Sequence, residues 1–248
     1  MAKISIDINY IKDSLEKMGY VISDCVEREN NGSFWQFKFS NSSAIVSVYD
    51  TNNKKNSVVG GKAEDEEREC LKEIVDKLKC KELQIDPMNR DVVDLINNQE
   101  ERDYCDFKVE FHHEKGDLLH DILCLSNNTG NKDAFLIFGV ADDGEVVGIK
   151  EKLSSNNLFD FLRGIEFAGG HMPDVEVKNL YYCHKNIGVI VCKSSKFVPF
   201  YLIERYRKVM DHQIYTRVGD TNTPANKHAE YCDIEKLWRI HFERENEQ

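Results

Sequence analysis

Residues 105–112 alternate between apolar and polar side chains, the pattern of a β-strand with two unlike faces. The apolar set is Cys105, Phe107, Val109 and Phe111, and the polar set is Asp106, Lys108, Glu110 and His112. Because successive side chains point to opposite faces, one face should pack and the other should meet solvent or a ligand. Glu101 lies five residues before Asp106, an odd offset, so it joins the polar face only if the chain bends at 102–104.

The next two apolar patterns predict a helix and a buried strand. A helix opening at Gly116 or Asp117 would bury a broad stripe of leucine and isoleucine side chains, which are Leu118, Leu119, Ile122, Leu123 and Leu125. The continuously apolar run 134–140 predicts a strand buried on both faces. Asp143-Gly144 is typical of a hairpin turn into a strand at 145–149, which leaves Asp142 at the exit of the buried strand.

The same reasoning divides the chain into domains and predicts an α+β fold. Residues 1–82 are expected to form a small accessory domain, followed by a linker at 83–98 that holds a short helix at 91–96, and by a core domain at 99–248. In the first domain we expect helices at 8–18 and from Asp65, strands at 34–39, 44–49 and 57–60, and a turn at 52–56. In the core domain we expect further helices at 154–165 and 233–242 and strands at 174–183 and 187–192.

Composition adds limits on the class of protein. The 248 residues are 41% hydrophobic and 31% charged, which is typical of a globular protein, and no apolar run approaches the roughly 18 residues of a membrane span. We therefore expect a cytoplasmic protein, or a fragment of one, without a membrane partner. The eight cysteines include no Cys-x2-Cys pair, so we interpret them as reduced core thiols and not as disulfides or a zinc cluster.

Charge is unevenly distributed along the chain. The net charge is −11, yet residues 178–217 hold eight lysines and arginines against two acidic residues, a local balance of +6 that leaves −17 elsewhere. Aromatic residues interleave with these cations, as stacking platforms for unpaired bases would. The predicted nucleic-acid-binding residues are Lys185, Lys193, Lys196, Arg205, Arg207, Lys208, Tyr215 and Arg217. The alternative interpretation is that the aromatic rings fill a sheet core and the lysines solvate its outer face.

Four blocks in this order resemble the Schlafen-type AlbA_2 domain, over about residues 92–245. They are Glu101-x4-Asp106-Phe107-Lys108, the helix that ends in Leu125-Ser126-Asn127, the run from Ile137 through Gly139 to Gly148, and the pair of Pro199-Phe-Tyr201 with Tyr215-Thr-Arg217-Val-Gly219. The pattern of strands, Gly60-Gly61-Lys62 and an acidic helix is similar to TBP-like modules that accompany some bacterial nucleases.

The resemblance implies a metal-dependent endoribonuclease that acts on structured RNA such as tRNA, as a bacterial toxin or antiphage effector. Its catalytic acids fall on Glu101, Asp106 and Asp142, which would hold Mg²⁺ or Mn²⁺, and Lys108 would contact the phosphate. Asp106 departs from the usual glutamate by one methylene. The alternative is an AlbA_2-type module that binds DNA or RNA without cutting it. Only one lobe of the two-lobed Schlafen cleft is visible, which predicts a homodimer.

Each candidate also has a structural interpretation. Glu101 could be a solvated residue in an acidic run, Asp106 and Lys108 a same-face ion pair, and Asp142 the start of the following turn. Arg217 resembles a phosphate-contacting loop residue in the family, and otherwise belongs to a plain hairpin. The adjacent histidines His112 and His113 should point to opposite faces of a strand, which favours surface or core imidazoles over metal ligands.

Overall fold

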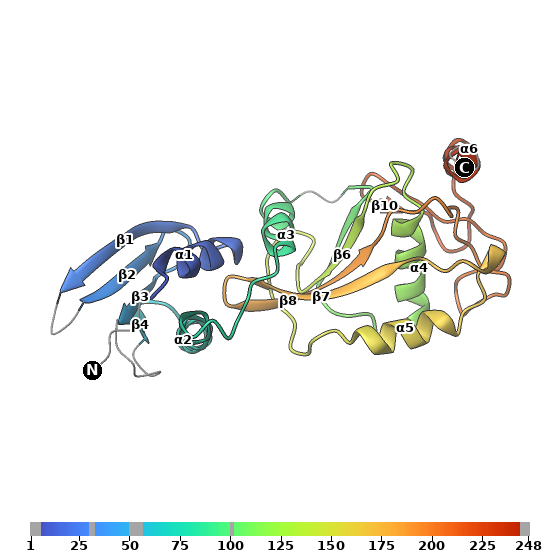
Figure 1. Ribbon diagram of the computed structural model, residues 1–248. Helices are drawn as coiled ribbons and strands as arrows, with labels where there is room; N and C mark the ends of the chain where they lie inside the picture. The colour runs from blue at the N-terminus through green and yellow to red at the C-terminus, as the bar shows by residue number, and fades with distance from the viewer. Residues whose placement is uncertain (1–5, 30–32, 50–56, 100–101, 244–248) are drawn as a thin grey trace. The chain divides into compact units, whose positions relative to one another are not determined.

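The computed structural model describes residues 6–29, 33–49, 57–99 and 102–243. The chain divides into two compact units, one of residues 1–94 with 180–185 and the other of residues 95–179 with 186–248. Figure 1 shows the elements of each unit along the chain. Each unit mixes helices with sheet, which confirms the predicted α+β class.

The first unit is a four-stranded antiparallel sheet with two helices. The sheet order is β1-β2-β3-β4, and the elements are α1 (Ile8–Lys17), β1 (Ile22–Glu29), β2 (Ser33–Phe39), β3 (Ala44–Tyr49), β4 (Ser57–Gly61) and α2 (Asp65–Lys79). The predicted helix from Asp65 buries one apolar stripe in the core of this unit, at Leu71, Ile74, Val75 and Leu78. Strand β1 was not predicted, because most of its residues are charged or polar and it pairs on one side only. The predicted turn at 52–56 lies outside the described residues.

A short helix, α3 (Met88–Asn97), follows the first unit's last helix. It begins three residues earlier than predicted, because Asp86 Oδ1 accepts a hydrogen bond of 2.9 Å from the Met88 backbone N–H. The buried Asn89 amide donates to the carbonyl oxygens of Lys17 and Tyr181 at 2.8 and 2.7 Å. These two hydrogen bonds compensate for the burial of the amide group.

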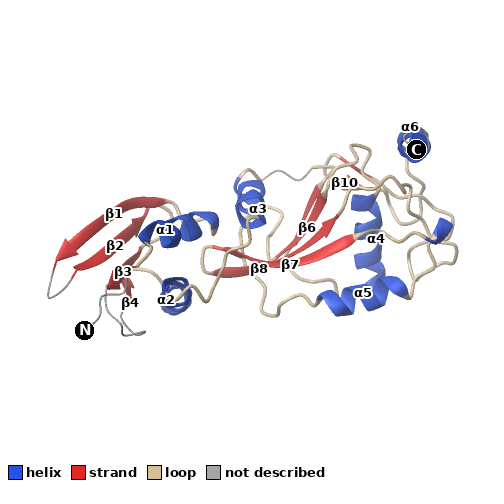
Figure 2. Ribbon diagram, in the orientation of Figure 1, coloured by secondary structure: helices blue, strands red, loops and turns tan. Residues whose placement is uncertain are grey.

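The second unit is built on a mixed sheet of order β5-β6-β8-β7. Its strands are β5 (Cys105–Lys108), β6 (Ala134–Phe138), β7 (Val175–Tyr182) and β8 (Lys185–Cys192), and α4 (Lys115–Ser126) is the crossover between the parallel pair β5 and β6. One core cluster joins the predicted apolar stripe of α4 to alternate residues of β6 and β8 and to α5 (Ser155–Arg163). Both helices lie beside this sheet in Figure 2.

The last third of the chain completes this unit with short elements. They are a 3₁₀ turn η1 (Ala168–Gly170), the two-residue strands β9 (Arg217–Val218) and β10 (Thr221–Asn222), and α6 (Tyr231–Glu243). The β9–β10 hairpin returns the chain toward β5, since the Arg217 side chain contacts the backbone of Arg102. None of the described helices is long and apolar enough to cross a membrane.

Two strand predictions require correction. Strand β5 ends at Lys108, so Val109 and Phe111, predicted to pack, are 45% and 42% exposed. Residues 145–149 form no strand beyond a single bridge between Val140 and Val146. The reason lies at Gly139, whose N–H pairs with the Lys108 carbonyl and whose own carbonyl accepts from Val147 and Gly148. The chain folds back at once there instead of extending.

Candidate functional site

Asp106 is a buried carboxylate in the middle of β5. The sequence pattern placed it on the strand face that meets solvent or a ligand, but three consecutive residues of this strand are buried and Asp106 itself is 2% exposed. Asp106 Oδ2 lies 2.7 Å from Lys108 Nζ, and its Oδ1 lies 3.3 Å from Arg217 Nη2. The predicted same-face pair of Asp106 and Lys108 therefore exists, and a second cation joins it. A carboxylate this deeply buried needs such compensation.

Arg217 is a buried structural residue in this arrangement. Its side chain is 2% exposed, Nε donates to the Arg102 carbonyl at 2.8 Å, and Nη1 donates to Asn222 Oδ1 at 2.9 Å. The expectation of a phosphate-contacting arginine is therefore not met in this conformation, because the guanidinium is covered and its hydrogen bonds are directed into the protein. Arg217 instead fixes the β9–β10 hairpin onto β5.

The polar network continues to Asp121 on α4, which the sequence reasoning did not select. Asn222 Nδ2 donates to Asp121 Oδ1 at 2.9 Å, and His112 Nε2 donates to Asp121 Oδ2 at 2.8 Å. Burial raises the pKa of Asp121, but the hydrogen bonds from His112 and His120 outweigh it and hold the pKa well below its usual range. The signal was available, since a carboxylate in the middle of the apolar stripe of a helix requires partners.

The predicted metal ligands do not make a metal centre within the described part of the chain. Glu101 lies outside the described residues. Asp142 is exposed and forms no ion pair with another described residue, whereas both oxygens of Asp106 face cations. No group of three histidine, cysteine or acidic side chains converges as a cation site in the ranges that the structure describes. Because Glu101 is not described, convergence of Glu101, Asp106 and Asp142 on Mg²⁺ or Mn²⁺ stays a prediction.

The predicted basic face is largely neutralised by carboxylates. Lys193 contacts Asp133 and Glu176 at 3.1 and 3.5 Å, and the Asp133 hydrogen bond raises the pKa of Lys193. Arg207 pairs with Glu114, and Lys208 pairs with Asp117. Lys196 and Arg205 are exposed and Lys185 is half-buried.

Tyr215 needs a further correction. It is fully buried, and its hydroxyl accepts from Met210 N and lies within hydrogen-bond distance of two acceptors, Gln213 Oε1 and the Ala225 carbonyl, one of which takes its single proton. It is a core residue and not a stacking platform, as the alternative interpretation of the aromatic residues allowed.

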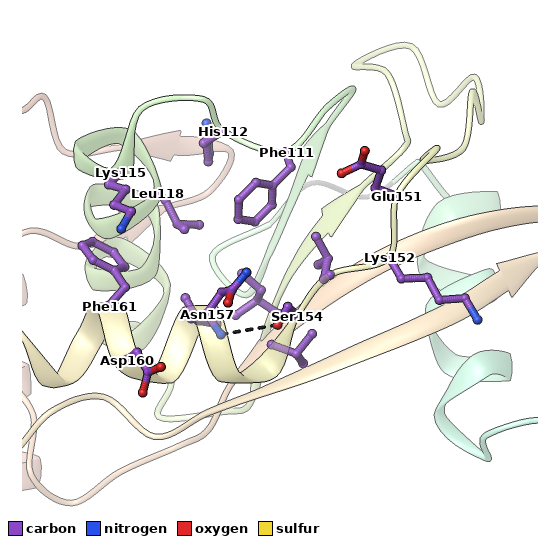
Figure 3. A pocket seen from close by; sticks show the side chains of 14 residues that line it. Phe111, His112, Lys115, Leu118, Glu151, Lys152, Ser154, Asn157, Asp160 and Phe161 are labelled. Atoms are coloured by element: carbon purple, nitrogen blue, oxygen red, sulfur yellow. Dashed lines mark hydrogen bonds between the residues drawn. The ribbon is translucent and has the colours of Figure 1, made fainter.

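Aromatic rings and cations do interleave at another place, around the first turn of α4. Lys115 Nζ lies 5.2 Å above the Phe161 ring, the Phe161 and Tyr206 rings are 5.6 Å apart, and the Arg207 guanidinium lies 6.0 Å from the Tyr206 ring. We call these four residues the aromatic–cation cluster. Gly116 permits it, because a Cβ there would come within 3.1 Å of Arg207 Cβ. Lys115 and Phe161 are labelled in Figure 3.

Comparison with family models identifies the family to which this unit belongs. The family model for the Schlafen AlbA_2 domain matches residues 101–226, the span that holds β5, α4, β6 and the β9–β10 hairpin. The chain belongs to the Schlafen AlbA_2 family. Neither the curated proteins nor the solved structures gave a match. The Schlafen AlbA_2 match leaves out residues 1–100, so the TBP-like resemblance of the first unit stays a prediction.

Proposed function

We propose that the Schlafen AlbA_2 unit is a nucleic-acid-binding module that contacts its ligand through the aromatic–cation cluster. The observation that carries the proposal is the ammonium of Lys115 over the buried Phe161 ring, which lies beside the half-buried Tyr206 ring, whereas Arg207 in the same cluster is already paired with Glu114. Cations attract phosphates, and aromatic rings stack on bases of any sequence. Family membership supports the same class of partner.

The protein's net charge of −11 does not oppose this proposal, because phosphate binding depends on the local potential. Most predicted cations of the 178–217 segment face carboxylates and contribute little to that potential. Lys115 differs, since it has no carboxylate partner among the described residues and its ammonium lies over an aromatic ring. Arg205, on the loop that reaches α4, is exposed and donates its Nε to the Arg207 carbonyl.

Salt-dependent binding tests the proposal. Fluorescence anisotropy with labelled single-stranded and duplex RNA and DNA should show affinities that fall linearly with log salt concentration. Lys115→Ala should weaken binding to all sequences and reduce the salt slope by about one. The control is Arg239→Ala, which removes an exposed cation on α6. The proposal would be contradicted if the protein bound no nucleic acid. It would also be contradicted if Lys115→Ala left binding unchanged while Arg239→Ala weakened it.

A metal-dependent endoribonuclease is the second candidate, favoured by two observations. The first is that Lys108 Nζ lies 2.7 Å from Asp106 Oδ2, within the sequence block that holds the catalytic acids of the family's nucleases. The second is that the exposed Asp142 lies two residues after Val140, and the Val140 N–H donates a hydrogen bond to the Lys108 carbonyl. Total tRNA incubated with the protein, with and without Mn²⁺, should then yield fragments only with the metal, and Asp142→Asn should abolish them. The matched control is the exposed Asp220→Asn. RNA that is shifted in mobility but uncleaved would retire this candidate.

A homodimer is part of the same proposal, because this chain supplies one AlbA_2 lobe and a duplex-sized groove needs two. Multi-angle light scattering at micromolar concentration should give twice the 28.8 kDa chain mass. A monomer at that concentration, with nucleic-acid binding intact, would confine recognition to a single lobe.

A further inference from the structure

The second unit contains a cavity of about 600 Å³ that none of the predicted site residues lines. It lies between the segment that leads into α4, residues 151–154 and the α5 helix, with Leu118, Leu158 and Ile190 forming an apolar floor. Figure 3 shows these side chains around one space. The volume falls in the range of small-ligand sites, roughly 300–1,000 Å³.

Phe111 forms one wall of this cavity and is incompletely covered. Its ring packs on Phe138 with centroids 5.2 Å apart, yet the residue remains 42% exposed. In Figure 3 the ring faces the space above Asn157. An aromatic ring supported from behind and open on its other side suits a planar ligand, because stacking needs little rearrangement.

Lys115 and His112 lie at one end of the cavity and could contact an anionic group there. Both side chains lie on the same side of Phe111 in Figure 3, opposite Glu151. The carboxylate of Asp121 accepts a hydrogen bond from His112 Nε2 and so fixes that ring in place. The two other charged side chains, Lys152 and Asp160, point away from the ring. A ligand with a planar face and one anionic end complements this distribution.

We infer that the cavity binds one unpaired nucleotide of a nucleic-acid strand, with its base against Phe111 and its phosphate toward Lys115 and His112. The inference rests on the proposed nucleic-acid binding and names its substrate class. Continuity with the interface identifies a strand as the source, since Lys115 and Phe161 belong both to the cavity and to the aromatic–cation cluster. Paired bases cannot enter, so the module should prefer single strands or unpaired loops.

The test compares single-stranded and duplex oligonucleotides with the full chain and its Phe111→Ala variant. Loss of one stacking contact should weaken single-strand binding about tenfold or more and leave duplex binding within about twofold. Phe242→Ala removes another half-exposed phenylalanine, on α6, and should change neither. Phe111→Leu keeps the apolar packing on Phe138 and should also lose single-strand affinity, which separates stacking from a folding defect.

The outcomes distinguish this inference from the proposed function. If the wild-type chain binds both ligands and Phe111→Ala changes neither, the nucleic-acid interface stands and the cavity assignment is overturned. If the wild-type chain binds no polynucleotide, both the proposed function and the cavity assignment are refuted. Competition with AMP, GMP, CMP and UMP forms the second arm: a mononucleotide that binds as tightly as the strand, and only when Phe111 is present, would assign the cavity to a free nucleotide instead.

Discussion

Replacing Arg217 with methionine tests whether the buried network holds the second unit together. The side chain keeps most of its volume, but Asp106, which is 2% exposed, keeps only Lys108 as a cationic partner among the described residues. The Arg102 carbonyl and Asn222 Oδ1 also lose their donor. Removing one partner of a buried ion pair costs about 3–5 kcal/mol, because the other charge stays buried. That is a large share of the roughly 5–15 kcal/mol that stabilises a domain.

The assay is urea unfolding followed by tryptophan fluorescence. The chain has two tryptophans, Trp35 on β2 and Trp238 on α6, so a Trp35→Phe background leaves a reporter in the second unit alone. Arg239→Met is the matched control, because its ion pair with Glu235 is exposed and should contribute no more than about 1 kcal/mol.

A double substitution isolates the pair itself. Asp106→Asn combined with Arg217→Met removes both buried charges, so the two changes together should cost less than the sum of their separate costs by about 1 kcal/mol or more. If Arg217→Met were no more destabilising than Arg239→Met, the charge of Arg217 would not be compensating Asp106. The reasoning would then be refuted, and a phosphate-binding role for Arg217 would again be open to test.

Three further measurements follow from the structure. Gly139→Ala should lower the free energy of unfolding by more than about 1 kcal/mol, because φ at Gly139 is +94° and a Cβ there would lie 2.9 Å from a backbone carbon. Gly164→Ala, at φ −79°, should be nearly neutral in the same urea unfolding measurement. The pKa of Asp121 is lowered in the folded protein, so its ionised carboxylate stabilises the fold above the unfolded pKa of about 4, and this contribution is lost as the pH falls below that value. In Asp121→Asn, the free energy of unfolding should therefore fall less steeply with decreasing pH than in the wild-type chain. Burial raises the pKa of Cys192 to about 12, so iodoacetamide at pH 8 should label the exposed Cys80 and spare Cys192 until urea unfolds the chain, as peptide mass spectrometry would show.

Periodicity predicted the regular elements well because each buries one regular stripe. The five apolar residues predicted on α4 are all buried, although the helix also buries His120, Asp121, Cys124 and Ser126, which the pattern did not indicate. The first unit followed the predicted pattern apart from its polar edge strand. Strand β5 is the exception, since three of its four residues, Asp106 among them, are buried and their burial does not alternate. Asp106 lies in the core because its second cationic partner, Arg217, comes from the β9–β10 hairpin, far along the chain.

The same long-range pairing explains why the predicted site differs from the observed one. The sequence shows that Arg217 is charged, but not that it pairs with Asp106, 111 positions earlier in the chain. From the sequence alone, a buried structural arginine therefore cannot be distinguished from one that binds phosphate. The distinction matters for function. With the Asp106 and Arg217 charges directed at each other, the proposed nucleic-acid interface relies on Lys115 at the end of α4. That interface is connected to the Asp106–Arg217 pair through the hydrogen bonds of His112, Asp121 and Asn222, so we expect substitutions in the cavity to alter the surroundings of Asp106 without contacting it.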